Sequence, residues 1–271
     1  MVTIEKIDFS QWGVSEFIED ILLLSPADNG KVDVEFVKFP QPHELLLLNV
    51  APAALESGSR GSILCGKSDR NSVYHATLEQ PICIVQFKPH AWYAFSRNRV
   101  QSFRNRMVPL QCNFGSCLKS FIQKHLPGYL LRVLKREKMK ESAYRMMPAM
   151  FDYVEAHLNT VTVSSLAAAF RISEATLRRY FNKYVGMNVN GYIRHRKLRK
   201  MIYRMYDNDY NAVAVQECGF YDQSHFIREF KRIHKVTPTH YLQNFRNLCH
   251  TKEHADRLFG ACYFRTVRPH V

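Results

Sequence analysis

Hydrophobic and polar residues alternate in the first part of the chain as they do along strands. From Val32 to Phe36, every second residue is apolar and the residues between are acidic, as expected for a strand with one buried face. The run 45–50 is almost entirely apolar, which predicts a strand buried on both faces. Further short strands are expected at 62–65, 72–76 and 82–87. This spacing predicts a small antiparallel barrel or sandwich.

The apolar spacing becomes helical beyond Pro89. Helices are expected at 91–96 and 114–125, and Pro127-Gly128 is expected to interrupt the chain before a basic amphipathic helix over 129–140. An apolar stripe predicts one helix over 142–158, and Ser164 is expected to cap the helix after it. The fold class is therefore α+β, with a β-rich domain and trailing helices over 1–140, an all-α domain of about seven helices over 141–250, and a tail over 251–271.

A repeat of about 49 residues occupies the all-α part. The pattern Leu177-x-Arg179-x-Phe181 recurs 49 residues later as Phe226-x-Arg228-x-Phe230. Before the turn the offset is 48, so the second turn is one residue longer. Each copy predicts a short helix, a tight turn and a second helix, which is the order of a helix-turn-helix.

The caps and turns of the two copies can be placed from their residue types. Ser173 and Asp222 are expected to cap the second helix of each copy. Gly219 suits the turn of the second copy, whereas Arg171 stands where the first copy requires a positive φ, a conformation that favours glycine. A long basic helix over 189–206 is expected to join the copies.

The charge of the chain indicates a polyanionic partner. The net charge is +14, and residues 171–204 carry 10 Lys/Arg against one acid, whereas residues 1–140 carry 18 against 13. This clustering favours nucleic acid, and the alternative is a solvated basic helix face. The seven cysteines show no disulfide spacing and the start of the chain lacks a signal-peptide pattern, so we expect a cytoplasmic protein that is not embedded in a membrane.

The second copy carries a family resemblance. Residues 218–231 include Cys-Gly-Phe-x-Asp-Gln-Ser-x-Phe-x-Arg-x-Phe-Lys, and Thr237-Pro238-x-x-Tyr241 follows. This run resembles the second DNA-reading unit of AraC/XylS-type bacterial transcription regulators. The segments 83–91 and 107–110 resemble the sensor half of the same family, which implies a cupin-like β-barrel that binds a small-molecule effector. The resemblance further implies an activator that binds double-stranded DNA and RNA polymerase and forms a homodimer through its N-terminal domain, with no cofactor.

The resemblance also implies which residues contact DNA. The base-reading positions match Ala175, Arg178, Arg179, Asn182, Gln223, Ser224, Ile227 and Arg228. Their chemistry is suitable, because arginine can pair with guanine, glutamine with adenine, and isoleucine can pack on a thymine methyl group. The positions assigned to phosphate contacts are Lys183, Arg194, Arg196, His225, Lys231, Arg232 and Lys235. Packing is an equally good interpretation of His225, and Arg179 and Arg228 could instead pair with neighbouring acids.

Other candidate sites have weaker patterns. Arg97, Arg99, Arg104 and Arg106 could bind a phosphorylated or cyclic-dinucleotide effector, although a solvated face explains them better. The histidines of the first half lack the spacing of a metal-binding cupin. Cys249, His250, His254 and Cys262 form a conceivable zinc set, but a disordered or loosely docked tail is the favoured interpretation.

Two further function classes compete with a ligand-responsive regulator. One is an enzyme fused to a DNA-binding unit, as in alkylation-response methyltransferases, but the first four cysteines are not clustered and no nucleotide loop or nucleophile motif is present in the sequence, so we expect no enzymatic activity. The other is a nucleic-acid binder that uses charge alone and has no preferred sequence.

Overall fold

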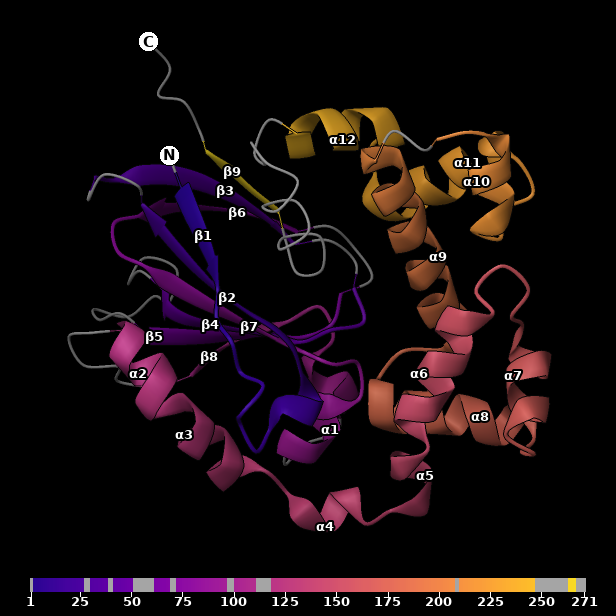
Figure 1. Cartoon of the computed structure of the whole chain (residues 1–271), viewed down its shortest axis with the longest axis horizontal. Coiled ribbons are helices and arrows are strands. Elements are labelled where there is room, and N and C mark those ends of the chain that lie inside the picture. The colour runs from indigo at the N-terminus through magenta and orange to yellow at the C-terminus, as the bar shows by residue number, and fades with distance from the viewer. Residues whose placement is uncertain are drawn as a thin grey trace.

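The β-rich half of the chain consists of two antiparallel sheets. The computed structural model describes residues 2–26, 30–38, 41–50, 61–68, 72–96, 100–110, 118–207, 210–246 and 263–266. One sheet has the order β1-β2-β7-β4-β5-β8 and the other the order β6-β3-β9 (Figure 1). The strands are β1 (Val2–Lys6), β2 (Ile18–Pro26), β3 (Val32–Lys38), β4 (Leu45–Val50), β5 (Gly61–Cys65), β6 (Ser72–Leu78), β7 (Ile82–Phe87), β8 (Met107–Leu110) and β9 (Tyr263–Thr266).

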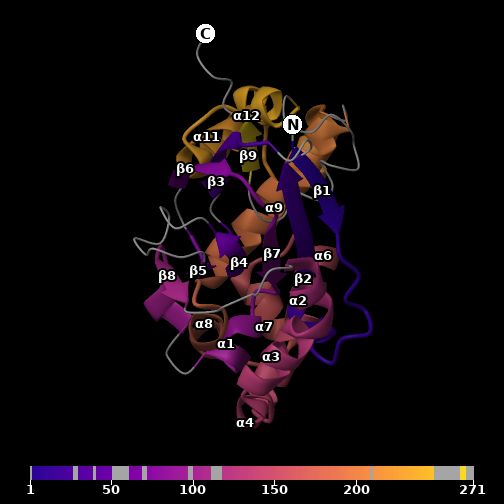
Figure 2. The ribbon, with the colours of Figure 1, turned by 90° about the vertical axis from the view of Figure 1, so that its left-hand side faces the viewer.

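The central strands of the six-stranded sheet are buried on both faces. Leu45 and Leu47 of β4 belong to an apolar cluster that also contains Leu78 of β6, on the second sheet. Leu46 and Leu48 belong to the cluster of α2 (Leu118–Lys124) and α3 (Leu126–Val133), which Figure 2 shows in front of this sheet. The prediction of a strand at 45–50 that is buried on both faces is confirmed.

The connecting helices lead from the sheets to the all-α part along one edge of the molecule (Figure 1). Beside α2 and α3, they are α1 (Ala91–Phe95), the 3-10 turn η3 (Val100–Phe103), α4 (Arg136–Met139) and α5 (Ser142–Arg145); another 3-10 turn, η1 (Ser15–Phe17), precedes β2. The all-α part contains α6 (Met147–Ala156), α7 (Val163–Ala169), α8 (Glu174–Tyr180), the π-helical turn η4 (Phe181–Val185), α9 (Val189–Tyr206), α10 (Ala212–Glu217), α11 (Gln223–His234) and α12 (Pro238–Arg246). None of the described helices combines the length and apolarity needed to cross a bilayer.

Several predicted boundaries are wrong, and prolines explain two of them. Pro127 does not interrupt the chain but lies in the first turn of α3, where its missing N–H has no helical partner to lose. The helix expected over 129–140 is two helices, α3 and α4, which are separated by Leu134 and Lys135. The helix expected over 142–158 is likewise divided at Met146, because Pro148 starts α6. Thr162, not Ser164, caps α7, in a reciprocal capping box with Ser165.

Part of the C-terminal tail returns to the N-terminal domain. β9 pairs antiparallel with β3, with Thr266 opposite Val34 and Tyr263 opposite Val37. The interpretation of the tail as disordered or loosely docked is therefore wrong for residues 263–266, which extend the smaller sheet. The conceivable zinc set at Cys249, His250, His254 and Cys262 lies outside the described residues.

Candidate nucleic-acid interface

The first helix-turn-helix unit consists of α7, a tight turn and α8. Arg171 adopts a φ of 53° in the turn, as predicted for a position where glycine is usual. The Ser173 hydroxyl then accepts a hydrogen bond from the Thr176 amide at 3.1 Å and caps α8. Leu177 and Phe181 are fully buried, so the opposite side of α8 faces solvent.

The second unit, α10 with α11, repeats this construction. The Asn211 side chain caps α10 through the Ala214 amide at 2.8 Å, and Asp222 caps α11 through the His225 amide at 2.6 Å. Gly219 has a φ of 78°, and a Cβ there would lie 2.6 Å from Lys197 Nζ and 3.0 Å from the Asn159 carbonyl. Glycine is therefore favoured here by the backbone conformation and by the close approach of the Asn159 carbonyl.

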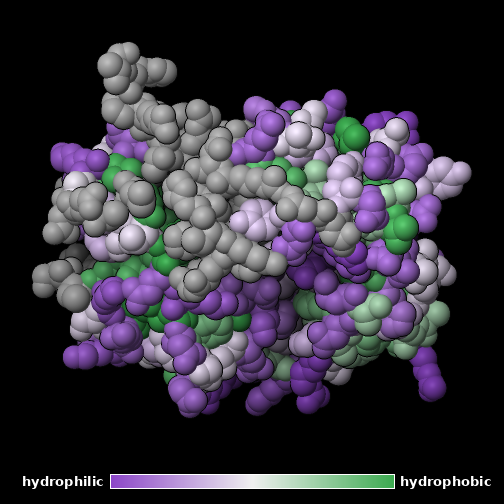
Figure 3. Space-filling view, turned by 45° about the horizontal axis from the view of Figure 1, so that its top comes forward, coloured by the Kyte–Doolittle hydropathy of each residue, from purple (hydrophilic) through white to green (hydrophobic). Residues whose placement is uncertain are grey.

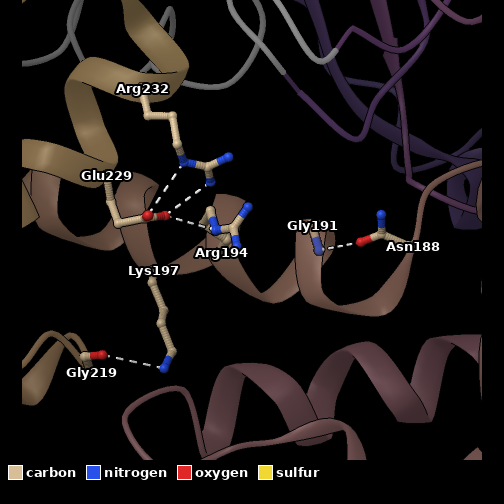
Figure 4. A network of polar contacts seen from close by, with 7 residues as sticks. All are labelled: Asn188, Gly191, Arg194, Lys197, Gly219, Glu229 and Arg232. Atoms are coloured by element: carbon tan, nitrogen blue, oxygen red, sulfur yellow. Dashed lines mark hydrogen bonds and ion pairs between the residues drawn. The ribbon is translucent and has the colours of Figure 1, made fainter.

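α9 joins the two units and fixes the second one with charged contacts (Figure 4). Asn188 caps α9 through the Gly191 amide at 2.7 Å. One turn further, Arg194 Nε lies 2.8 Å from Glu229 Oε2 on α11, and Arg232 holds the same carboxylate at 3.0 Å. Lys197 donates to the Gly219 carbonyl at 3.4 Å. α9 thus contacts both the turn and the exposed helix of the second unit.

The predicted base-reading residues lie on α8, on η4 directly after it, and on α11. In the first unit, Ala175, Arg178, Arg179 and Asn182 are all exposed. Arg178 pairs with Glu174 at 3.1 Å, whereas the Arg179 guanidinium lies over the Tyr180 ring. In the second unit, Gln223, Ser224 and Arg228 are exposed and Ile227 is half-buried.

The side chains of Arg179 and Arg228 form no ion pair with any described residue. Among the described residues, therefore, no neighbouring acid holds either of these two guanidinium groups in place. Both remain available to a ligand that approaches the exposed side of the helix. Figure 3 shows purple hydrophilic residues mixed with green hydrophobic ones at the right of the view.

The residues predicted to contact phosphate fall into two groups. Lys231 and Lys235 are exposed and make no side-chain contact with a described residue, and Arg232 is half exposed beside Glu229. Lys183, Arg194 and Arg196 are each paired with an acid, namely Glu141, Glu229 and Glu155. His225 accepts a hydrogen bond at Nδ1 from the Tyr221 amide and packs on Phe220, so the structure gives it a local packing role.

Glu141 links the first unit to the N-terminal domain. Its carboxylate accepts hydrogen bonds from Tyr93 Oη of α1 at 2.5 Å, Tyr184 Oη at 2.7 Å and Lys183 Nζ at 2.6 Å. Burial raises the pKa of Glu141, but the hydrogen bonds from Lys183, Tyr93 and Tyr184 outweigh it and bring the pKa to about 2. We call these four residues the Glu141 cluster.

A second contact joins the same two parts of the chain. Gln101 of η3 donates a hydrogen bond from Nε2 to the backbone carbonyl of Asn182, directly after α8. Val100 of η3 packs against Gly186, directly after η4. A Cβ added to Gly186 would lie only 2.8 Å from the Val100 side chain. The residues that follow α8 are therefore held by η3.

Two further observations bear on the predicted site. Of the candidate effector residues, Arg104 and Arg106 are exposed next to η3, whereas Arg97 and Arg99 lie outside the described residues. Tyr221, which the sequence reasoning did not select, is 84% exposed directly before the Asp222 cap of α11. The signal in the sequence that could have identified Tyr221 is its position, because it is a large residue in the predicted turn directly before the Asp222 cap.

Comparisons with known proteins agree with this geometry. Residues 166–244, from α7 to α12, match the model of a family described as a helix-turn-helix domain. The chain is 30% identical over 105 residues to an uncharacterized HTH-type transcriptional regulator, YijO, from Escherichia coli (strain K12). This match covers 38% of the chain and spans only 37% of that relative.

The match to one similar solved structure covers most of this chain, and the match to another covers about a third of it. ToxT from Vibrio cholerae is 11% identical, and the match covers 90% of this chain and 97% of that one with a TM-score of 0.43. The DNA-binding domain of AdpA, whose structure includes a target DNA, is 21% identical, and the match covers 36% of this chain and 91% of that one with a TM-score of 0.34.

Proposed function

We propose that this chain, which carries an AraC-type helix-turn-helix domain, is a sequence-specific transcription regulator that inserts α8 and α11 into two successive major grooves of DNA. The observation that supports this most directly is the pair of capped helices with solvent-facing polar sides, joined by the single helix α9. The 18 residues of α9 extend over roughly 27 Å. Successive major grooves on one face of B-DNA lie about 34 Å apart.

The base-reading roles follow from the exposed side chains. In the first unit we assign them to Ala175, Arg178, Arg179 and Asn182, and in the second to Gln223, Ser224, Ile227 and Arg228. Arginine and glutamine can each form two hydrogen bonds with one base, which is how side chains distinguish base pairs in the major groove.

Contacts with phosphate supply affinity and fix the register of the protein on DNA. We assign this role to Lys231, Arg232 and Lys235, which are exposed on α11 or directly after it, and Tyr221 is a further candidate next to the start of α11. Lys183 would have to leave Glu141, and Arg194 and Arg196 would have to leave their acids. Those three contacts therefore cost more to form than the contacts of Lys231 or Lys235. His225 keeps a phosphate role in this proposal only if its packing on Phe220 is compatible with it.

We further propose that the regulator responds to a small-molecule effector bound by the N-terminal half, acts as an activator that contacts RNA polymerase, and dimerises through the N-terminal domain. The contacts of α1 and η3 with η4, the turn directly after α8, support coupling between the two halves. A change in the N-terminal half can reach the DNA-reading helix through them.

The test compares Arg228→Ala with Lys231→Ala on DNA selected from a random library with the full-length protein. We expect Arg228→Ala to lose about 1–3 kcal/mol of binding free energy only when particular base pairs are present, because a base contact is removed. Lys231→Ala should weaken binding to all sequences and reduce the slope of log K against log salt by about 1, because a phosphate contact is removed.

The opposite results separate the competing functions. If Arg228→Ala and Arg179→Ala weaken binding to every DNA equally, the base-reading assignment is wrong. If the library yields no preferred sequence although binding falls steeply with salt, the protein binds nucleic acid by charge alone.

A further inference from the structure

A cavity lies where the connecting helices leave the N-terminal domain. Its volume is about 480 Å³, within the range of roughly 300–1,000 Å³ that is usual for small-molecule sites. It is a groove open to solvent, bordered by α3, α4 and α5, by the loop before η1 and by η1 itself. Figure 1 shows α3, α4 and α5 along the lower edge of the molecule. The lining residues are Gly13, Glu16, Leu131, Leu134, Arg136, Met139, Lys140 and Arg145.

The cavity has an apolar floor and a basic rim. Leu131, Leu134 and Met139 are half-buried, whereas Arg136, Lys140 and Arg145 are exposed. None of these three basic side chains forms an ion pair or a hydrogen bond with any described residue. Glu16 is the single acid among the residues that line the cavity, so the rim has an excess of positive charge.

We propose that this cavity binds a small organic anion, with its acidic group against the basic rim and its apolar body on Leu131, Leu134 and Met139. A guanidinium group can hold two oxygens of a carboxylate, sulfonate or phosphate at once, and two arginines are present. The inference rests on the proposed function of a regulator that responds to an effector, and it names the chemical class of that effector. It differs from the earlier assignment to the arginines between 97 and 106, because the cavity is formed by other residues.

The cavity adjoins the Glu141 cluster along the chain. Lys140 on the rim directly precedes Glu141, and Arg145 ends the next helix, α5. Glu141 in turn holds Lys183, which lies directly after α8.

The experiment measures binding of three anions to the full-length protein by isothermal titration calorimetry. The probes are naphthalene-2-sulfonate, 4-phenylbutyrate and octyl phosphate, and naphthalene-2-sulfonamide is the uncharged match of the first. We expect at least one anion to bind with a Kd on the order of 10–100 μM. The sulfonamide should bind at least about 3-fold more weakly than the sulfonate, since it lacks the charge.

Variants locate the site and include a matched control. The double variant Arg136→Gln/Arg145→Gln should weaken binding of the anion roughly 3- to 10-fold. Arg132→Gln removes one charge from an exposed residue of α3 that does not line the cavity, so it should leave the Kd unchanged. All three substituted residues are exposed, and circular dichroism verifies that each variant is folded.

Three results would overturn the proposal: no saturable binding of any of the three anions, equal binding of sulfonate and sulfonamide, or equal effects of Arg132→Gln and the double variant. Binding of DNA is measured in the same preparations without any probe. A protein that binds its selected DNA sequence but none of the anions contradicts only this inference. A protein that binds the anions but has no preferred DNA sequence contradicts the proposed function instead.

Discussion

Arg171 has a backbone conformation that glycine adopts more readily than arginine does. Its φ of 53° lies in the left-handed region, which costs a residue with a Cβ about 1–2 kcal/mol. Glycine adopts this conformation without that cost but loses more conformational entropy on folding. We expect Arg171→Gly to raise the free energy of unfolding by about 0.5–1 kcal/mol, measured by urea denaturation followed by circular dichroism.

Arg171→Ala is the control for this substitution. It removes the same charge but retains the Cβ, so the free energy of unfolding should stay within about 0.5 kcal/mol of the unmodified protein. Equal stabilisation by alanine and glycine would show that the charge of Arg171, and not its backbone, is unfavourable.

Residue types predicted the local features of the site, because these depend on neighbouring residues only. The positive φ at Arg171 and Gly219 and the caps at Ser173 and Asp222 are confirmed. The acids that hold the basic side chains could not be predicted in this way. Glu141 and Glu155 precede Lys183 and Arg196 by 42 and 41 residues, so only the packing of distant elements brings them together.

At the scale of elements, α11 is attached to α9 through Glu229. Its carboxylate lies between Arg194 of α9 and Arg232 of its own helix. In a double-mutant cycle with Arg194→Ala and Glu229→Ala, we expect a coupling energy of about 0.5 kcal/mol, since both side chains are partly solvated. Urea denaturation at pH 7 measures the four free energies of unfolding.

The coupling should depend on pH in a defined direction. Desolvation raises the pKa of Glu229, but the hydrogen bond from Arg232 and the charge of Arg194 lower it below its ordinary value of 4.5. The stabilisation is therefore complete above pH 4.5 and is lost as the pH falls below it. A coupling energy of zero at pH 7, or one that increases toward low pH, would contradict the role of Glu229 as a bridge.

Long periodic elements were predicted better than short ones. α9 begins and ends at the predicted residues, Val189 and Tyr206, because its amphipathic pattern extends over five turns and Gly186 stops the helix before it. The sequence reasoning missed β1, β2, β8 and β9. In β2, the residues from Ile21 to Leu24 are all buried, but an apolar run of four residues does not by itself distinguish a strand from a helix.

At the scale of the whole molecule, the Glu141 cluster joins α1 to η4, the turn directly after α8. Glu141 competes with a DNA phosphate for the charge of Lys183. Glutamine at position 141 retains hydrogen-bonding capacity for Tyr93 and Tyr184 but gives up the ion pair. We expect Glu141→Gln to increase DNA affinity roughly 2- to 5-fold at low salt, because Lys183 no longer has to leave an acid.

The number of phosphate contacts provides the sharper measurement. With Lys183 released, the slope of log K against log salt should become steeper by about 0.9, the value of one added contact on B-DNA. Glu137→Gln is the matched control, since Glu137 lies on α4, shortly before Glu141 in the chain. Its side chain is exposed and forms no ion pair or hydrogen bond with a described residue. An equal gain from Glu137→Gln would assign the effect to net charge alone. Adding Lys183→Ala to Glu141→Gln should abolish the gain, and a gain that persists would show that Lys183 does not contact DNA.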